Sequence, residues 1–239
     1  VPAVAPPANG NSDIPVAPVN SATVSPVPAA ASPVVHRVHV RTDVLDVSID
    51  PNGGDITGLS LPTYTRTADS REPFALLESG PARQFIAQSG LIGANGPDAR
   101  PDARPLYQAE KPEFTLAPGQ KDLTVTLKFQ DQNGIEIHKN FVFHAGRYDI
   151  GVNYQVINRS TQPWRGMMFG QLKRDNTEDP SKNHQGMMGM STYLGGAWGD
   201  PDETYNKLSF DKFAKEPLNK QHTGGWVAVV QHYFVTSWI

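Results

Sequence analysis

Residues 123–156 read LTVTLKFQDQNGIEIHKNFVFHAGRYDIGVNYQV, and this stretch decides the fold class. In its first part, 123–129, apolar residues alternate with Thr and Lys, which is the period of a strand with one buried face. The segment 131–134 predicts a hairpin turn, because Asn-Gly accepts positive φ. Similar alternation continues through 135–143 and 148–156. We therefore predict an antiparallel sheet with one apolar face.

Segments on either side extend the strand pattern. Val44–Ile49 alternates, and the turn at 51–54 leads to Ile56, Leu59 and Leu61. The 21 Gly and 21 Pro among 239 residues argue against a helical bundle. The whole chain is predicted to be all-β.

Three further stretches are less regular. The segments 80–105 and 173–196 show no period and are predicted to be long irregular loops. The apolar stretch Trp226–Ile239 fits a helical stripe as well as a strand, and its Val, Tyr, Phe and Thr content favours a strand.

The chain divides into two parts by composition. Residues 1–35 consist mainly of Val, Pro, Ala, Ser and Asn with Asp13 as the one charge, which predicts an extended, disordered linker without packed contacts. Residues 36–239 form the folded domain. Because the chain does not begin with Met and ends in an apolar segment without a polar tail, we expect a piece of a longer protein, truncated at its C-terminal end.

Composition also excludes several classes. A net charge of −3 offers no basic patch for nucleic acid, and the absence of Cys excludes disulfides and cysteine-ligated metals. No run of 18 apolar residues exists, so no segment is predicted to span a membrane. No phosphate-binding or nucleotide-binding glycine motif is present, and we expect no cofactor.

Two local clusters allow two interpretations each. Asp200, Asp202 and Glu203 could hold calcium, but Asp200 followed by Pro201 is more typical of a helix start, which predicts a short helix near 201–208. The Met groups at 167–168 and at 187, 188 and 190 could bind Cu(I), but Met more often fills an irregular core.

A direct repeat lies in the first irregular stretch. Pro97-Asp98-Ala99-Arg100 is followed at once by Pro101-Asp102-Ala103-Arg104. We interpret it as a solvated loop with local Asp–Arg pairs of little energetic value.

The chain resembles a known family in a series of ordered motifs. The motifs are Thr42-Asp43-Val44-Leu45-Asp46-Val47, Gly53-Gly54-Asp55, Leu61-Pro62-Thr63-Tyr64, Pro73-Phe74-Ala75-Leu76-Leu77-Glu78, Ala87-Gln88-Ser89-Gly90-Leu91, Gly96-Pro97-Asp98, Phe169-Gly170-Gln171-Leu172-Lys173, Gly224-Gly225-Trp226-Val227-Ala228, Tyr233-Phe234 and Trp238-Ile239. Each motif is short, and their order and spacing carry a resemblance, from about Val38 to the end, to the large periplasmic domain of YidC membrane protein insertases.

This resemblance implies a fold and a setting. The fold would be a twisted antiparallel β-supersandwich, similar to galactose mutarotase. The domain would lie in the periplasm, in a protein anchored in the Gram-negative inner membrane, and would contact the SecD/SecF subunits of the Sec translocon and nascent membrane proteins.

Two functions therefore compete. The first is a non-catalytic interaction module that assists insertion and folding of inner-membrane proteins. The second is a carbohydrate-binding or mutarotase-like enzyme of the same fold, which would need a general acid and a general base facing one sugar ring. No His and carboxylate pair is marked by its sequence context, so we expect no catalytic residues. The candidates for a cleft or partner contact are aromatic: Tyr193, Trp198, Tyr205, Trp226 and Tyr233.

Overall fold

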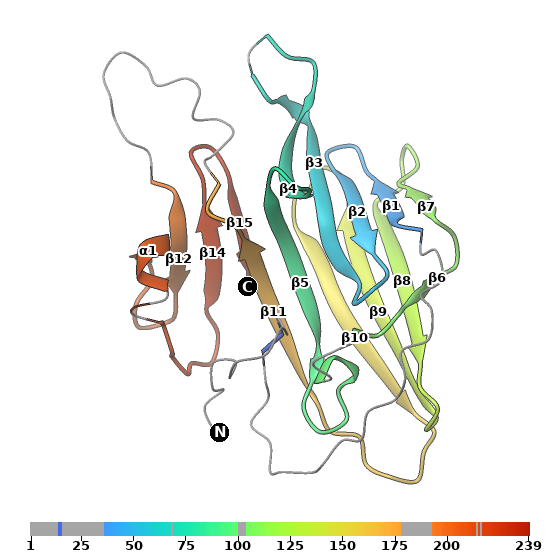
Figure 1. Ribbon diagram of the computed structural model, residues 1–239. Helices are drawn as coiled ribbons and strands as arrows, with labels where there is room; N and C mark the ends of the chain where they lie inside the picture. Colours follow the sequence, from blue (N-terminus) through green and yellow to red (C-terminus); the bar gives the residue numbers. More distant parts are fainter. Residues whose placement is uncertain are drawn as a thin grey trace.

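A computed structural model describes residues 14–15, 36–67, 69–99, 104–177, 193–213, 215 and 217–239. These residues form three sheets and very little helix (Figure 1). The predicted all-β class is confirmed, and the layered sheets agree with a supersandwich.

The first sheet is the largest and is antiparallel except where β1 and β7 pair in parallel. Its order is β11 (Met167–Arg174), β5 (Gln84–Ile92), β4 (Pro73–Ser79), β3 (Asp55–Thr65), β2 (Asp46–Asp50), β1 (Val38–Arg41) and β7 (Glu113–Thr115). The second sheet has the order β10 (Ile150–Asn158), β9 (Ile135–His144), β8 (Asp122–Gln130) and β6 (Gln108–Ala109). The two sheets face each other across the main core (Figure 1).

The second sheet confirms the predicted meander. In β9 every second residue from Ile135 to Phe143 is buried, and this row contacts the first sheet. The pairing places Val125 opposite Phe141 and Phe129 opposite Ile137, so the apolar rows of β8 and β9 lie on the same face. The middle of the buried β9 row is a charged residue, Lys139.

A third sheet lies beside β11 (Figure 1). Its order is β13 (Asn206–Leu208), β12 (Gly195–Gly199), β14 (Trp226–Val230) and β15 (Val235–Trp238). The indole of Trp238 donates to the carbonyl oxygen of Gln171 at 3.2 Å, and a side chain at Gly170 would collide with its ring. The buried guanidinium of Arg83 also joins the sheets, donating to Gln231 Oε1 at 3.1 Å.

The predicted irregular stretch 80–105 contains a full strand, so that prediction is wrong in part. All residues of β5 after Gln84 are buried, because one face meets the main core and the other is covered as well. A strand buried on both faces loses the period of two, which is why alternation did not find it. A 3₁₀ turn, η1 (Pro97–Ala99), follows it.

The prediction of a helix near 201–208 is also wrong in position. Asp200 Oδ1 does accept the amide hydrogens of Asp202 and Glu203, at 3.0 and 2.7 Å, as a cap would. However, the amide of Asp200 donates to the carbonyl of Glu203 at 2.9 Å, which closes a turn, and the chain continues as β13. The helix found is a single turn, α1 (Phe210–Phe213).

Three other expectations are refined. The segment 226–239 is extended as predicted, but it folds back as the β14–β15 hairpin, with Val227 opposite Trp238. Met167 and Met168 are exposed on β11 and do not fill the core, whereas 187–190 lie outside the described residues. Within 1–35 only residues 14–15 are described, and Ile14 is buried against Ile92 and Phe169, so the expectation of no packed contacts is wrong there.

The alternation of β8 leads to a direct stability test. Leu127 is fully buried, and Leu127→Ala should lower the free energy of unfolding by about 2–5 kcal/mol, because it removes apolar contact and leaves a cavity. Lys128→Ala, at the next and exposed position, should change it by less than about 0.5 kcal/mol. Urea unfolding measures both, and similar losses in the two variants would contradict the assigned face.

Candidate functional site

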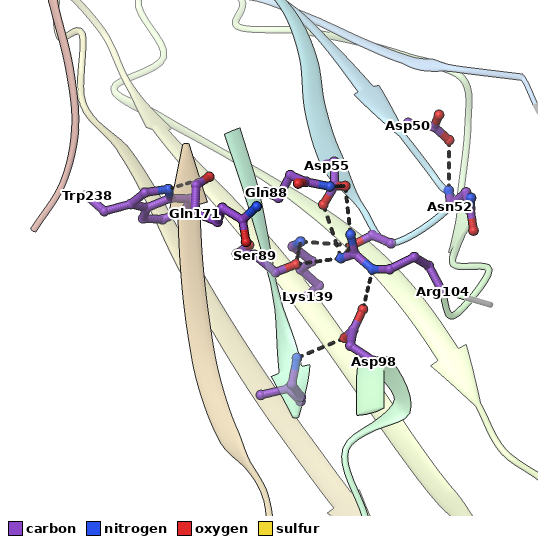
Figure 2. Close-up of polar contacts among 12 residues, drawn as sticks. Asp50, Asn52, Asp55, Gln88, Ser89, Asp98, Arg104, Lys139, Gln171 and Trp238 are labelled. Carbon is purple, nitrogen blue, oxygen red and sulfur yellow. Dashed lines mark hydrogen bonds and ion pairs between the residues drawn. The ribbon is translucent and has the colours of Figure 1, made fainter. Parts of the chain in front are cut away.

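The interior between the first two sheets contains four charged side chains, which we call the ion cluster (Figure 2). Asp55 begins β3, Asp98 lies in η1, and Arg104 follows η1 along the chain. Lys139 enters from β9 on the opposite sheet. Two carboxylates therefore face two cations in a region that water does not reach freely.

Arg104 is the centre of the ion cluster. Its guanidinium binds Asp55 through two parallel contacts, Nη1 to Oδ2 at 2.8 Å and Nη2 to Oδ1 at 3.1 Å. Its Nε donates to Asp98 Oδ1 at 2.5 Å. Such bidentate geometry suits the planar fork of arginine and not the point charge of lysine.

The remaining polar atoms around the carboxylates are also paired. Asp98 Oδ2 accepts the amide hydrogen of Leu91 at 2.8 Å. Gln88 Nε2 donates to Asp55 Oδ2 at 2.7 Å. Both carboxylates thus accept bonds from β5 in addition to those from Arg104, which offsets part of the cost of burying them.

Lys139 donates hydrogen bonds to two backbone carbonyl groups of the first sheet and its turn. Its Nζ donates to the carbonyl oxygens of Gly53 at 3.0 Å and of Ser89 at 2.9 Å. Arg104 Nη2 donates to the same two oxygens, at 3.3 and 3.0 Å. The two cations therefore join the turn before β3 to the middle of β5.

Burial changes the protonation equilibria of these groups. Burial lowers the pKa of Lys139 to about 7, although the carboxylate of Asp55 opposes the shift. Burial raises the pKa of Asp98 despite the nearby guanidinium of Arg104. For Arg104, burial acts downward, but Asp55 and Asp98 together hold its pKa above the ordinary value.

The turn before β3 must approach these cations closely. Gly53 and Gly54 have φ of +84° and +65°, values that favour glycine. A Cβ at Gly53 would collide with the guanidinium of Arg104, and one at Gly54 would lie 2.9 Å from Cδ of Lys139. The Gly53-Gly54-Asp55 motif is thus explained by space as well as by turn geometry.

The ion cluster corrects the interpretation of the Pro-Asp-Ala-Arg repeat as a solvated loop. Asp98 of the first copy is 1% exposed, and it pairs with Arg104 of the second copy. Residues 100–103 lie outside the described residues. The cluster's carboxylates and cations are occupied with one another and with backbone groups, so its role is to hold β3, β5, η1 and β9 together.

A groove of about 860 Å³ is the second feature of interest. Its floor is apolar and consists of core residues: Leu45, Leu59, Leu61, Phe74 and Leu76. Strands β3 and β4 extend beyond the ends of β1 and β2 (Figure 1). Residues 63–65, in this extension of β3, line the groove.

Aromatic side chains form the rim of the groove. Tyr64 is 46% exposed and Tyr148 is 47% exposed, with ring centroids 6.2 Å apart. Phe234 stacks on Phe74 at 4.3 Å and meets Tyr64 edge-on at 5.5 Å. Tyr233, in the β14–β15 turn, is 70% exposed. Three regions distant in the sequence therefore meet at this opening.

The aromatic candidates from the sequence do not form one cluster. Tyr233 lines the groove. The others lie on the third sheet or next to it. The hydroxyl of Tyr193 donates to the carbonyl of Gly196 at 2.6 Å, and the ammonium of Lys220 lies 4.1 Å from the ring centroid of Trp198. Tyr205 contacts Trp226, with ring centroids 6.0 Å apart.

Sequence reasoning missed Tyr64, Tyr148 and Phe74 as rim and floor residues. Tyr64 and Phe74 occur in family motifs, but no local pattern marks either of them as lining a groove. Lys139 had a signal, because the alternation of β9 places position 139 in the buried row.

Two other polar groups could suggest chemistry. Glu136 Oε1 lies 2.6 Å from His138 Nε2 on the polar face of β9, and this hydrogen bond lowers the pKa of Glu136, opposite to the need of a general acid. Asp200, Asp202 and His222 bring ligand atoms together, but Lys220 Nζ lies 3.8 Å from Asp200 Oδ2 and supplies positive charge there.

Comparison with known proteins gives one consistent result. The family model of the YidC periplasmic domain matches residues 37–239. The chain is 46% identical over 233 residues to membrane protein insertase YidC of Pseudomonas fluorescens (strain Pf0-1), covering 97% of the chain and 41% of that protein. It is 48% identical over 233 residues to the protein of that name from Pseudomonas putida (strain W619), with the same coverage.

A relative from another genus agrees. Membrane protein insertase YidC of Azotobacter vinelandii is 46% identical over 230 residues, covering 96% of the chain and 40% of that protein. The chain thus spans about two-fifths of the length of these relatives. Among the described residues, no helix is long and apolar enough to cross a membrane.

Removing the central cation should be costly. Arg104→Met leaves two buried carboxylates without their partner and should lower the free energy of unfolding by about 3–5 kcal/mol. Arg147 pairs with Asp149 at 2.7 Å on the surface, and Arg147→Met should lower the free energy of unfolding far less, because water and salt screen an exposed pair. Equal losses in urea unfolding would show that the ion cluster contributes no more than a surface pair.

The depressed pKa of Lys139 predicts a pH dependence. Between about 7 and 10.5 the unfolded chain retains a proton that the folded protein has released, so stability should increase with pH by up to about 1.4 kcal/mol per unit. Lys139→Met should remove this increase, whereas Lys128→Met, on the exposed face of β8, should retain it. A slope that is unchanged in Lys139→Met would contradict the prediction.

Proposed function

This chain belongs to the family of YidC periplasmic domains, and from that membership we propose that it is a non-catalytic module assisting insertion and folding of inner-membrane proteins. The observation that carries the proposal is the family match over 37–239, together with relatives that bear the name membrane protein insertase. The domain would occupy the periplasm, with the rest of the protein in the Gram-negative inner membrane. We place its boundary with the preceding linker at residue 36.

The proposed partners are the SecD/SecF subunits of the Sec translocon and nascent membrane proteins. The exposed aromatic and apolar residues on different sheets support such contacts, since protein-binding surfaces are enriched in aromatic side chains. Tyr205 at 53% and Tyr233 at 70% exposure are examples, and they lie in separate parts of the third sheet's connections.

The non-catalytic role is supported by the state of the polar groups. In the ion cluster, Arg104 pairs with Asp55 and Asp98, and Lys139 donates to backbone carbonyls. The groove is lined mainly by apolar residues. Mutarotation needs an acid and a base on opposite sides of a sugar. The pairs Glu136–His138 and Asp122–His144 join neighbouring groups on a strand face, and neither contributes to the groove.

Cross-linking in the full-length protein tests the partners. A photoreactive phenylalanine analogue replaces Tyr64, Lys128 or Tyr205, which are exposed on the three sheets. We expect a covalent product with SecD or SecF from at least one position in living cells. Absence of such products at all three, with normal protein levels, would refute the proposed partners.

Polarimetry tests the competing enzyme. Mutarotation of α-glucose with the chain present should proceed at the spontaneous rate, because the described lining of the groove holds no carboxylate and no histidine. An acceleration that His138→Ala or His144→Ala abolishes would establish the enzymatic function instead.

A further inference from the structure

The edge of β3 is open where it borders the groove. Strand β2 pairs with β3 only as far as Asp46 opposite Ser60, so Leu61–Thr65 continue past the end of β2. On the other side β4 pairs with Leu61 and Thr65 but with no residue between them. Among the described residues, 62–64 therefore have no ladder partner, and all three are exposed.

This open edge and the apolar floor lie together. Thr63, Tyr64 and Thr65 line the same groove as Leu45 and Leu59. An unpaired strand edge offers backbone donors and acceptors to an added strand, and adjacent pockets accept its alternate side chains. The groove thus combines both elements that recognise an extended peptide.

The charge of the residues that line the groove indicates which kind of peptide it would bind. In the part of the chain that the structure describes, Arg66 is the one charged residue that lines the groove. Its nearest recorded carboxylate, Glu72, lies 4.0 Å away, and both side chains are more than half exposed, so the positive charge is weakly compensated. The described residues that line the groove include no carboxylate and no amide side chain to bind sugar hydroxyls, which favours a peptide over a glycan.

We propose that this groove binds an extended, apolar segment of a membrane-protein substrate that carries an acidic residue. The segment's backbone pairs with the open edge of β3 at 61–65. Its apolar side chains lie on the apolar floor between Tyr64 and Tyr233, and its carboxylate pairs with Arg66. Only the identity of the substrate rests on the proposed function; the binding itself rests on the groove.

Peptide binding to the full 239-residue chain tests the proposal. The probe is a fluorescein-labelled peptide of about eight residues, alternating Val and Thr with one central Glu, and its twin carries Lys instead. Fluorescence anisotropy should show tighter binding of the Glu peptide. Arg66→Ala should weaken binding of that peptide by about threefold and should not weaken binding of the Lys twin, because it also removes a repulsion.

Two further comparisons separate the groove from other surfaces. Tyr233→Ala should weaken the Glu peptide by about tenfold, because it removes a rim aromatic. Tyr205→Ala removes an exposed aromatic outside the groove and should leave binding unchanged. Equal effects of the two variants, or no binding of either peptide, would overturn the proposal.

Backbone methylation tests the pairing with β3. Successive N–H groups of an extended peptide point to opposite edges, so N-methyl groups at odd positions block one edge and those at even positions block the other. One methylated peptide should bind like the parent and the other should not. Equal binding of both, with displacement by dodecyl maltoside, would show a general apolar pocket and overturn the proposal.

The outcomes distinguish this inference from the proposed function. Failed peptide binding with retained SecD or SecF cross-links would remove the groove as a substrate site and leave the accessory module intact. Peptide binding without those cross-links would support the groove and contradict the proposed partners.

Discussion

The guanidinium of Arg104 is the group on which the interior of the sandwich depends. Carboxylates buried without a partner are severely destabilising, and Asp55 and Asp98 are both buried against the first sheet. Arg104 binds both and also reaches the carbonyls of Gly53 and Ser89. Arg104, a loop residue, thereby connects the beginning of β3, the middle of β5 and η1 on the first sheet.

Strand β3 combines two different environments along one element. Its first residue, Asp55, is held in the ion cluster, while its last residues, from Pro62 to Thr65, lie exposed beside the groove. The contacts of Asp55 fix the first residue of β3, while the last residues of the strand stay exposed. The β14–β15 turn of the third sheet packs beside that end of β3. Its Phe234 stacks on Phe74, and its Gln231 accepts a hydrogen bond from Arg83.

Local patterns in the sequence were sufficient for the elements whose environment is simple. The meander of β8, β9 and β10 has one buried face, so its alternation was visible, and the motifs identified the family. Strand β5 is buried on both faces and shows no alternation. The pairing of Asp98 with Arg104, and the meeting of Tyr64, Tyr148 and Tyr233, depend on tertiary contacts that no local pattern encodes.

The reach of Lys139 has a consequence for the order in which the chain can fold. The carbonyl oxygens of Gly53 and Ser89 both accept a hydrogen bond from Lys139, which lies 86 positions after Gly53 in the chain. During synthesis the N-terminal part of the chain emerges first, and the hairpins of the first sheet can form early because their contacts are local. Because Lys139 reaches these oxygens only when β9 arrives, the hydrogen bonds at the centre of the sandwich are completed by the same step that closes it.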